Sequence, residues 1–118
     1  MDKKTMQERT KNFALRVIRL INTLPDTPTT RVIGNQLLRS ATSVGANYRA
    51  ACRAKSDADF LYKLSIVEEE ADESLYWLEL ILEAEIVREP LLQPLLQEAN
   101  ELVAITVATI KTLKQNKK

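Results

Sequence analysis

The sequence holds very few residues that would interrupt a helix. Only two glycines and four prolines occur among its 118 residues. Proline ends a helix because it lacks a backbone N–H and clashes with the preceding turn, and the four prolines stand in two short segments, 25–28 and 90–94. Elsewhere apolar residues recur at steps of three and four, the spacing of one face of a helix. The sequence therefore predicts an all-α fold made of long amphipathic helices.

Four helices are expected, and most have a recognisable start or stop. Thr5 and Glu8 have the spacing of a capping box, and Leu24-Pro25 should end the first helix. Thr27 and Ser56 are placed to cap the second and third helices. The expected helices cover residues 5–24, 28 to about 54, 57 to about 88, and 90 or 94 to about 114, with frayed ends at about 1–4 and 115–118.

Each expected helix carries one apolar stripe that can face a common core. The predicted core residues are Phe13, Val17, Leu20, Ile21 and Leu24 in the first helix, Ile33, Leu37, Ala41, Val44, Tyr48 and Cys52 in the second, Phe60, Leu64, Val67, Ala71, Leu75, Leu78 and Leu82 in the third, and Leu95, Ala99, Leu102, Thr106, Ile110 and Leu113 in the fourth. Because the links are short, consecutive helices should pack antiparallel. We expect one domain, residues 1–118, folded as an antiparallel up-down-up-down four-helix bundle.

The composition argues against an enzyme. The sequence has no histidine and a single cysteine, Cys52. It therefore lacks the Ser-His and Cys-His pairs of nucleophilic enzymes and the ligands of most zinc and di-iron sites, and we expect no catalytic activity, cofactor or metal. The first ten residues are charged and the apolar runs are short, so neither a signal peptide nor a membrane span is expected, and the location should be cytoplasmic.

The net charge of +1 conceals a strong asymmetry along the chain. Five basic residues and no acidic ones lie between Thr30 and Lys55, whereas eleven acidic and two basic residues lie between Asp57 and Glu89. The second and third helices should therefore carry opposite charge. Such helices can pair with each other or across a subunit boundary.

The third helix has a second face that a monomeric bundle would not need. At about 100° per residue, the side opposite its core stripe holds aromatic and apolar residues around one acid: Tyr62, Ile66, Glu69, Tyr76, Trp77 and Leu80. Exposed Tyr and Trp beside apolar residues are enriched at protein interfaces. This face predicts an oligomer interface; the alternative is a helix that lies centrally in its own bundle.

The second helix carries an arginine stripe opposite its core face. Arg31, Arg39, Arg49 and Arg53 fall within an arc of about 80° and span about 33 Å along the helix. Arginine binds carboxylates and phosphates in a forked geometry, so the stripe can pair with acids of a neighbouring third helix or follow a phosphate backbone. Gly45, in a run of small residues of this helix, predicts close approach of another backbone, since glycine costs about 1 kcal/mol there.

The segment LRSATSVGAN (residues 38–47), followed by IVEEEADE (residues 66–73), resembles a family of four-helix bundles. These proteins are encoded by intervening sequences of bacterial large-subunit ribosomal RNA genes and were formerly classed as a ribosomal protein. The resemblance runs from about Phe13 to Leu113. Its motif corresponds to Arg39, Ser43, Asn47 and Glu73, which we expect to form one polar cluster because covered polar groups need partners.

The resemblance implies an antiparallel four-helix fold and a ring-shaped homopentamer. Related proteins accompany diversity-generating retroelements, where they are thought to bind a reverse transcriptase and nucleic acid through basic surface. One departure stands out in this chain. The family pattern follows its asparagine with Glu-Gly, whereas this sequence has YRAA at residues 48–51, which makes the face more basic through Arg49.

Three functional hypotheses follow. The first is a non-enzymatic homo-oligomer that binds nucleic acid, RNA above all, through Arg16, Arg19, Arg31, Arg49 and Arg53 of the first two helices. The second is an interaction scaffold, with itself or another protein as partner, whose arginine stripe is used in its own subunit interface. The third is a carboxylate metal or hydrolase site built from Glu68, Glu69, Asp72 and Glu73, which is disfavoured because bundle di-iron sites use Glu-x-x-His pairs.

Overall fold

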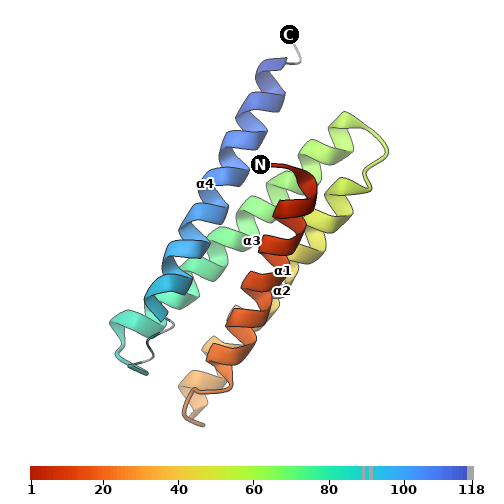
Figure 1. Ribbon diagram of the computed structural model, residues 1–118. Helices are drawn as coiled ribbons and strands as arrows, with labels where there is room; N and C mark the ends of the chain where they lie inside the picture. The colour runs from red at the N-terminus through yellow and green to blue at the C-terminus, as the bar shows by residue number, and fades with distance from the viewer. Residues whose placement is uncertain (89, 91, 117–118) are drawn as a thin grey trace.

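A computed structural model describes residues 1–88, 90 and 92–116, and within these residues the chain forms four helices (Figure 1). They are α1 (Lys3–Ile21), α2 (Pro28–Cys52), α3 (Asp57–Glu83) and α4 (Leu92–Asn116). The molecule is elongated, with extents of 50 × 21 × 20 Å. The predicted all-helical fold class is confirmed.

The helices pack in chain order around one core. The most extensive contact joins α2 to α3, the α3–α4 and α1–α2 contacts follow, and α1 closes on α4 through a much smaller contact. Both termini lie at the same end of the bundle in Figure 1, as expected when an even number of helices alternates in direction. Short links between long helices allow this up-and-down order and leave little room for any other.

The buried residues of each helix repeat at alternating steps of three and four. α1 buries Met6, Thr10, Phe13, Val17 and Leu20, and α3 buries Leu64, Val67, Ala71, Ser74, Leu78 and Ile81. The same alternation runs through the buried positions of α4 and, apart from the additional buried residue Ser40, through those of α2. It averages 3.5 residues, the repeat that keeps one seam of a helix facing its neighbours at a shallow crossing angle.

This repeat corrects the predicted core at the end of α3. Leu82 was expected in the core but is 36% exposed, whereas Ile81 is fully buried. Ile81, three residues after Leu78, stays on the buried seam of α3, whereas Leu82, four residues after it, lies off the seam. One turn earlier the seam position is Ser74, which the apolar pattern passes over because serine is polar; its hydroxyl donates to Ser40 Oγ of α2 at 3.0 Å.

Several predicted core residues lie at the margin of the core. They are half-buried and pack against it: Ile21, Leu24, Ile33, Cys52, Phe60, Leu75, Ile110 and Leu113. The remaining predicted core residues are buried, except Leu82. A bundle of four helices has a narrow interior, so the positions beside each seam are covered on one side only.

The starts of α2 and α3 follow the prediction, α4 begins at Leu92, between the predicted starts at 90 and 94, and α1 differs. Thr27 caps α2 through a capping box with Thr30, and Ser56 caps α3 by accepting from the backbone N–H of Asp59. The first helix begins earlier than predicted: Asp2 accepts from the backbone N–H of Thr5 at 2.7 Å, so Lys3 and Lys4 are helical rather than frayed. An aspartate satisfies the free N–H groups of a first turn as well as Ser or Thr does.

The helix ends also differ from the prediction by a few residues. α1 ends at Ile21 rather than Leu24, because the next residues turn before Pro25. α2 ends at Cys52, with Arg53 as its C-cap, and α3 ends at Glu83. α4 runs from Leu92 to Asn116, so Gln115 and Asn116 are helical, while 117–118 lie outside the described residues.

Candidate interaction surfaces

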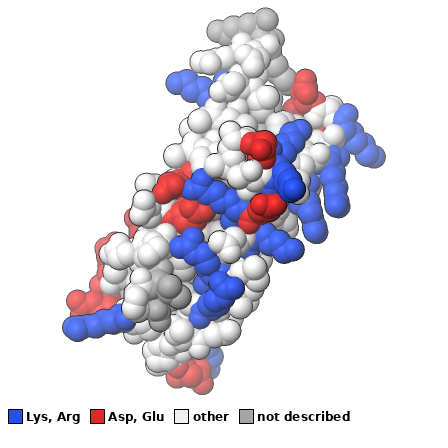
Figure 2. All heavy atoms as spheres, viewed as in Figure 1, with Lys and Arg blue, Asp and Glu red and all other residues white. Residues whose placement is uncertain are grey.

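Lysines and arginines gather on the side of the molecule formed by α1 and α2 (Figure 2). Of the predicted nucleic-acid-binding residues, Arg19, Arg49 and Arg53 are exposed and Arg16 is half-buried. Arg31 is exposed as well, but its Nε donates to Asp26 Oδ1 at 2.8 Å. Both partners of that pair are mostly in solvent, where an ion pair contributes little.

The cations of this side are distinguished by what they do not contact. The ion pairs found within the described residues engage Arg9, Arg31, Arg39 and Lys63. Six other cations of the α1–α2 side form no ion pair within the described residues. We call these six residues the basic surface: Lys4, Lys11, Arg16, Arg19, Arg49 and Arg53.

A groove marks the contact between α1 and α2 on this side. It encloses about 410 Å³ and is lined by Lys11 and Glu8 from α1 and by Gly45, Ala46 and Arg49 from α2. A Cβ on Gly45 would lie 3.4 Å from the backbone and side chain of Thr10. The backbone of α1 therefore approaches α2 closely at Gly45, as the place of that glycine in the sequence predicted.

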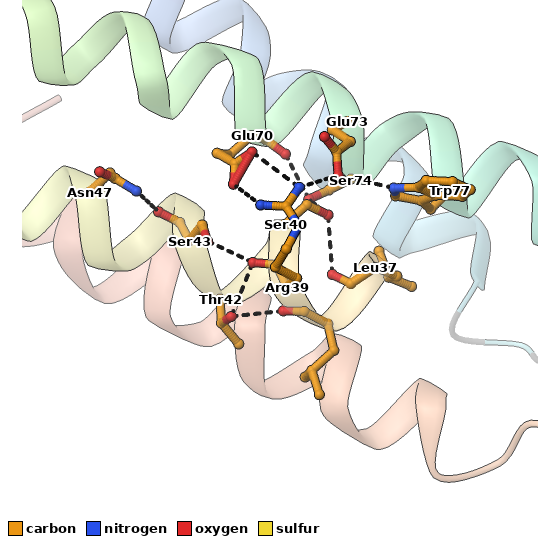
Figure 3. Close-up of polar contacts among 11 residues, drawn as sticks. Leu37, Arg39, Ser40, Thr42, Ser43, Asn47, Glu70, Glu73, Ser74 and Trp77 are labelled. Carbon is orange, nitrogen blue, oxygen red and sulfur yellow. Dashed lines mark hydrogen bonds and ion pairs between the residues drawn. The ribbon is translucent and has the colours of Figure 1, made fainter. Parts of the chain in front are cut away.

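The motif residues of α2 and α3 meet in part (Figure 3). Arg39 Nη1 donates to Glu70 Oε2 at 2.9 Å, and Arg39 Nη2 contacts Glu73. Trp77 Nε1 donates to the same Glu73 oxygen at 3.2 Å. The hydrogen bonds to Glu70 first, and then to Glu73, raise the pKa of Arg39 above its usual value.

Ser43 and Asn47 do not join this contact. The Ser43 hydroxyl donates to the carbonyl of Arg39 at 2.7 Å, and the Asn47 amide donates to the carbonyl of Ser43 at 2.8 Å. Both side chains bond one turn back on their own helix, as serine and asparagine commonly do. The predicted cluster is therefore two linked parts: an Arg39–Glu70–Glu73–Trp77 network between helices and a local pair on α2.

A contact between α1 and α4 was not predicted from the sequence. Arg9 Nε and Nη2 donate to the two carboxylate oxygens of Glu98, both at 2.7 Å, and Nη2 also reaches Glu101 at 2.6 Å. The hydrogen bonds that Arg9 donates to Glu98 are the main reason that the pKa of Arg9 is raised. The sequence did contain an indication of this contact. Arg9 borders the α1 core stripe, and Glu98 and Glu101 flank Ala99 and Leu102 on α4, so opposite charges stand beside the core on both helices.

The second face of α3 is open in the protomer. Tyr62 and Tyr76 are 65% and 53% exposed; Glu69 is exposed, while Ile66, Trp77 and Leu80 are half-buried. Tyr76 and Trp77 stack edge to face, with ring centroids 5.2 Å apart. α3 contacts α2 and α4, and these contacts cover this face only in part, so the oligomer interface stays a prediction.

The described residues contain neither a candidate metal cluster nor a membrane-spanning helix. No group of three or more His, Cys, Asp or Glu side chains is arranged there to hold a metal ion. Nor does that part of the chain contain a helix both long and apolar enough to cross a membrane. Cys52 is half-buried and packs against the core, as the sequence suggested for a lone cysteine.

Comparison with known proteins gives this architecture a family. The crystal structure of a protein of unknown function from the S23 ribosomal protein family of Bacteroides thetaiotaomicron VPI-5482 superimposes with a TM-score of 0.84, at 34% sequence identity, and the match covers 94% of this chain and 99% of that one. No curated protein sequence matches the chain. The sequence pattern of the 23S rRNA-intervening sequence protein family matches residues 2–108. The chain belongs to that family.

Proposed function

We propose that this protein is a non-enzymatic, self-assembling helical bundle that binds nucleic acid, RNA in particular, through the basic surface of α1 and α2. Assembly uses a different surface, the second face of α3. In this proposal no residue performs a chemical step, and no metal or cofactor takes part. The protein acts by holding a nucleic acid, alone or together with a protein partner, on a rigid scaffold.

The observation that carries the proposal is the selective pairing of charges. Two arginines have carboxylate partners on another helix: Arg9 of α1 pairs with Glu98 of α4, and Arg39 of α2 pairs with Glu70 of α3. Arg49 and Arg53 have none within the described residues, and both are exposed. Unpaired guanidinium groups on one side of a molecule are suited to phosphates, whose oxygens accept two parallel hydrogen bonds.

The family supports RNA as the ligand to test first. The family name links its members to intervening sequences of 23S ribosomal RNA. A ligand of that kind is made and used in the cytoplasm, so the proposal includes a cytoplasmic location. The overall charge of +1 is consistent with a localised contact surface rather than a protein basic on all sides.

The open face of α3 supports assembly. Two tyrosines in solvent, with Ile66 and Leu80 between and beside them, form the kind of aromatic and apolar surface that subunit interfaces cover. The resemblance described above implies a homopentameric ring, and we adopt that state for the proposal. In a ring each protomer uses two different patches, one on each side.

A second candidate function follows from the acids of α3. Glu69 and Asp72 are exposed and have no ion pair with another described residue. They could meet Arg49 and Arg53 of the next protomer, since opposite charges steer and align protein surfaces. The protein would then be an interaction scaffold whose arginine stripe is consumed in its own interface.

A binding titration separates these functions. A fluorescein-labelled RNA hairpin and a labelled DNA duplex are titrated with the protein at several salt concentrations, while light scattering records the assembly. For nucleic-acid binding, the logarithm of the association constant should fall linearly with the logarithm of salt, with a slope of about 0.7–0.9 per phosphate contacted. Absence of binding at low salt, with the assembly intact, would favour the scaffold.

A further inference from the structure

We infer that the groove between α1 and α2 is a phosphate-binding subsite, in which Lys11 and Arg49 hold the same phosphodiester group of a nucleic-acid strand. The inference rests on the proposed function and adds a location to it. Most cations of the basic surface stand apart from one another. In this groove, two cations from different helices, Lys11 and Arg49, line the same cavity.

The walls of the groove supply the charge. Lys11 projects from α1 and Arg49 from α2, and both line the same space of about 410 Å³. Both are exposed, and neither belongs to an ion pair in the described part of the chain. Packed helices lie about 8–10 Å apart, so the long side chains of both residues can converge on one group between them.

Small residues leave space in the groove beside the two cations. Gly45 and Ala46 line it from α2 and Ala14 lines it from α1, together with the polar residues Gln7 and Thr42. The backbone of α1 at Thr10 approaches α2 closely at Gly45, which brings the two sides of the groove together. This space is where we place the phosphate group.

The groove extends into further positive charge. Arg53 follows Arg49 by one helical turn, and Lys4 precedes Lys11 by two turns on the same side of α1. Successive phosphates of a strand that leaves the groove would meet these exposed residues next. A lone anion would gain nothing from Lys4 and Arg53, so the arrangement favours a polymer of phosphates as the ligand.

One acidic residue opposes the ligand and provides a sharp test. Glu8 lines the same groove and is exposed. Its carboxylate would lie near a bound phosphate and repel it. Replacing Glu8 with Gln keeps the size of the side chain and removes the charge, so a phosphate in the groove should then bind about two- to fivefold more tightly.

The experiment measures salt-dependent binding of the labelled RNA hairpin to wild type, Lys11→Ala, Arg49→Ala, the double variant and Glu8→Gln. Lys111→Ala is the matched control, since Lys111 is an exposed lysine of α4 outside the groove. Circular dichroism and light scattering confirm that each variant is folded and assembled. If both cations hold one phosphate, each single variant should weaken binding but nearly keep the salt slope, and the double variant should lose about 0.7–0.9 of the slope.

Each other outcome contradicts the inference in a distinguishable way. Equal binding by the double variant and Lys111→Ala would exclude the groove while leaving the proposed function in place. If each single variant lowers the salt slope, and the two losses add up to the loss in the double variant, Lys11 and Arg49 contact two different phosphates rather than one. No gain in Glu8→Gln would place the ligand elsewhere, and loss of assembly in the double variant would make the groove a subunit contact. No binding by wild type would remove the proposed function itself.

Discussion

Tyr48 is a single core residue whose ionisation makes the free energy of unfolding depend on pH. Its side chain is 7% exposed and lies in the core beside Cys52. Burial, and then interaction with Cys52, raises the pKa of Tyr48 to about 12. A buried phenol resists ionisation because the phenolate loses its hydration.

The sign of the effect on stability follows from this shift. In the unfolded chain the pKa of tyrosine is about 10, so the folded state holds the proton more tightly. The stabilising contribution of Tyr48 is complete below about pH 10 and is lost as the pH rises towards about 12. Urea unfolding should therefore show a steeper alkaline decline in the free energy of unfolding for wild type than for Tyr48→Phe. Parallel curves would contradict this account.

Other single residues mark the limit of what the sequence could predict. Arg39 and Glu73 meet as the motif suggested, but Glu70 shares the guanidinium, and Ser43 and Asn47 turn to their own backbone. Local hydrogen bonds of serine and asparagine compete with contacts between helices. Spacing on a helical wheel gives the direction of a side chain, and it does not give the partner that the side chain selects.

At the scale of helices, the number, order and core faces were predictable because few residues interrupt them and the apolar pattern is strong. The errors arose where the core contains polar residues. Ser40, Ser74 and Thr10 are fully buried seam or near-seam residues, and each hydroxyl bonds to a carbonyl of its own helix. Because an apolar pattern skips such positions, the predicted stripe of α3 moved off the seam to Leu75 and Leu82.

Two successive positions of that stripe, Leu78 and Leu82, can be tested directly. Leu78 is fully buried, and Leu78→Ala should lower the free energy of unfolding by about 2–5 kcal/mol through lost contacts and the cavity left behind. Leu82 has the same side chain on the same helix but is 36% exposed. Leu82→Ala should therefore cost less than about 1 kcal/mol. Equal losses in chemical denaturation would show that the seam lies between the two.

The positions of charged partners on different helices were not predictable in the same way. Arg9 and Glu98 stand at opposite ends of the sequence, and their contact depends on the register between α1 and α4. That register is set by core packing along the whole bundle, which a pattern on one helix does not contain. The contact matters because α1 and α4 otherwise touch little.

For the whole molecule, two surfaces with different chemistry lie on different parts of the bundle. The basic surface belongs to α1 and α2, and the open aromatic face belongs to α3. Exposed tyrosines on the latter, at 65% and 53%, would be partly removed from water by a second copy. Burying apolar area is the main favourable contribution to association.

The assembly prediction follows from this face. Wild type should scatter light as a particle of five chains of 13.4 kDa each. Ile66 and Leu80 are half-buried in the protomer, so aspartate in both places should leave the helices formed while placing charges where a neighbouring chain would cover them. The double variant should therefore be monomeric and helical. Val107→Asp is the control, because Val107 is 43% exposed on α4, outside this face. A wild type that stays a single chain at micromolar concentration would contradict the interface. A double variant that keeps the wild-type mass would contradict it as well, because a contact between chains does not tolerate two buried, unpaired carboxylates at its centre.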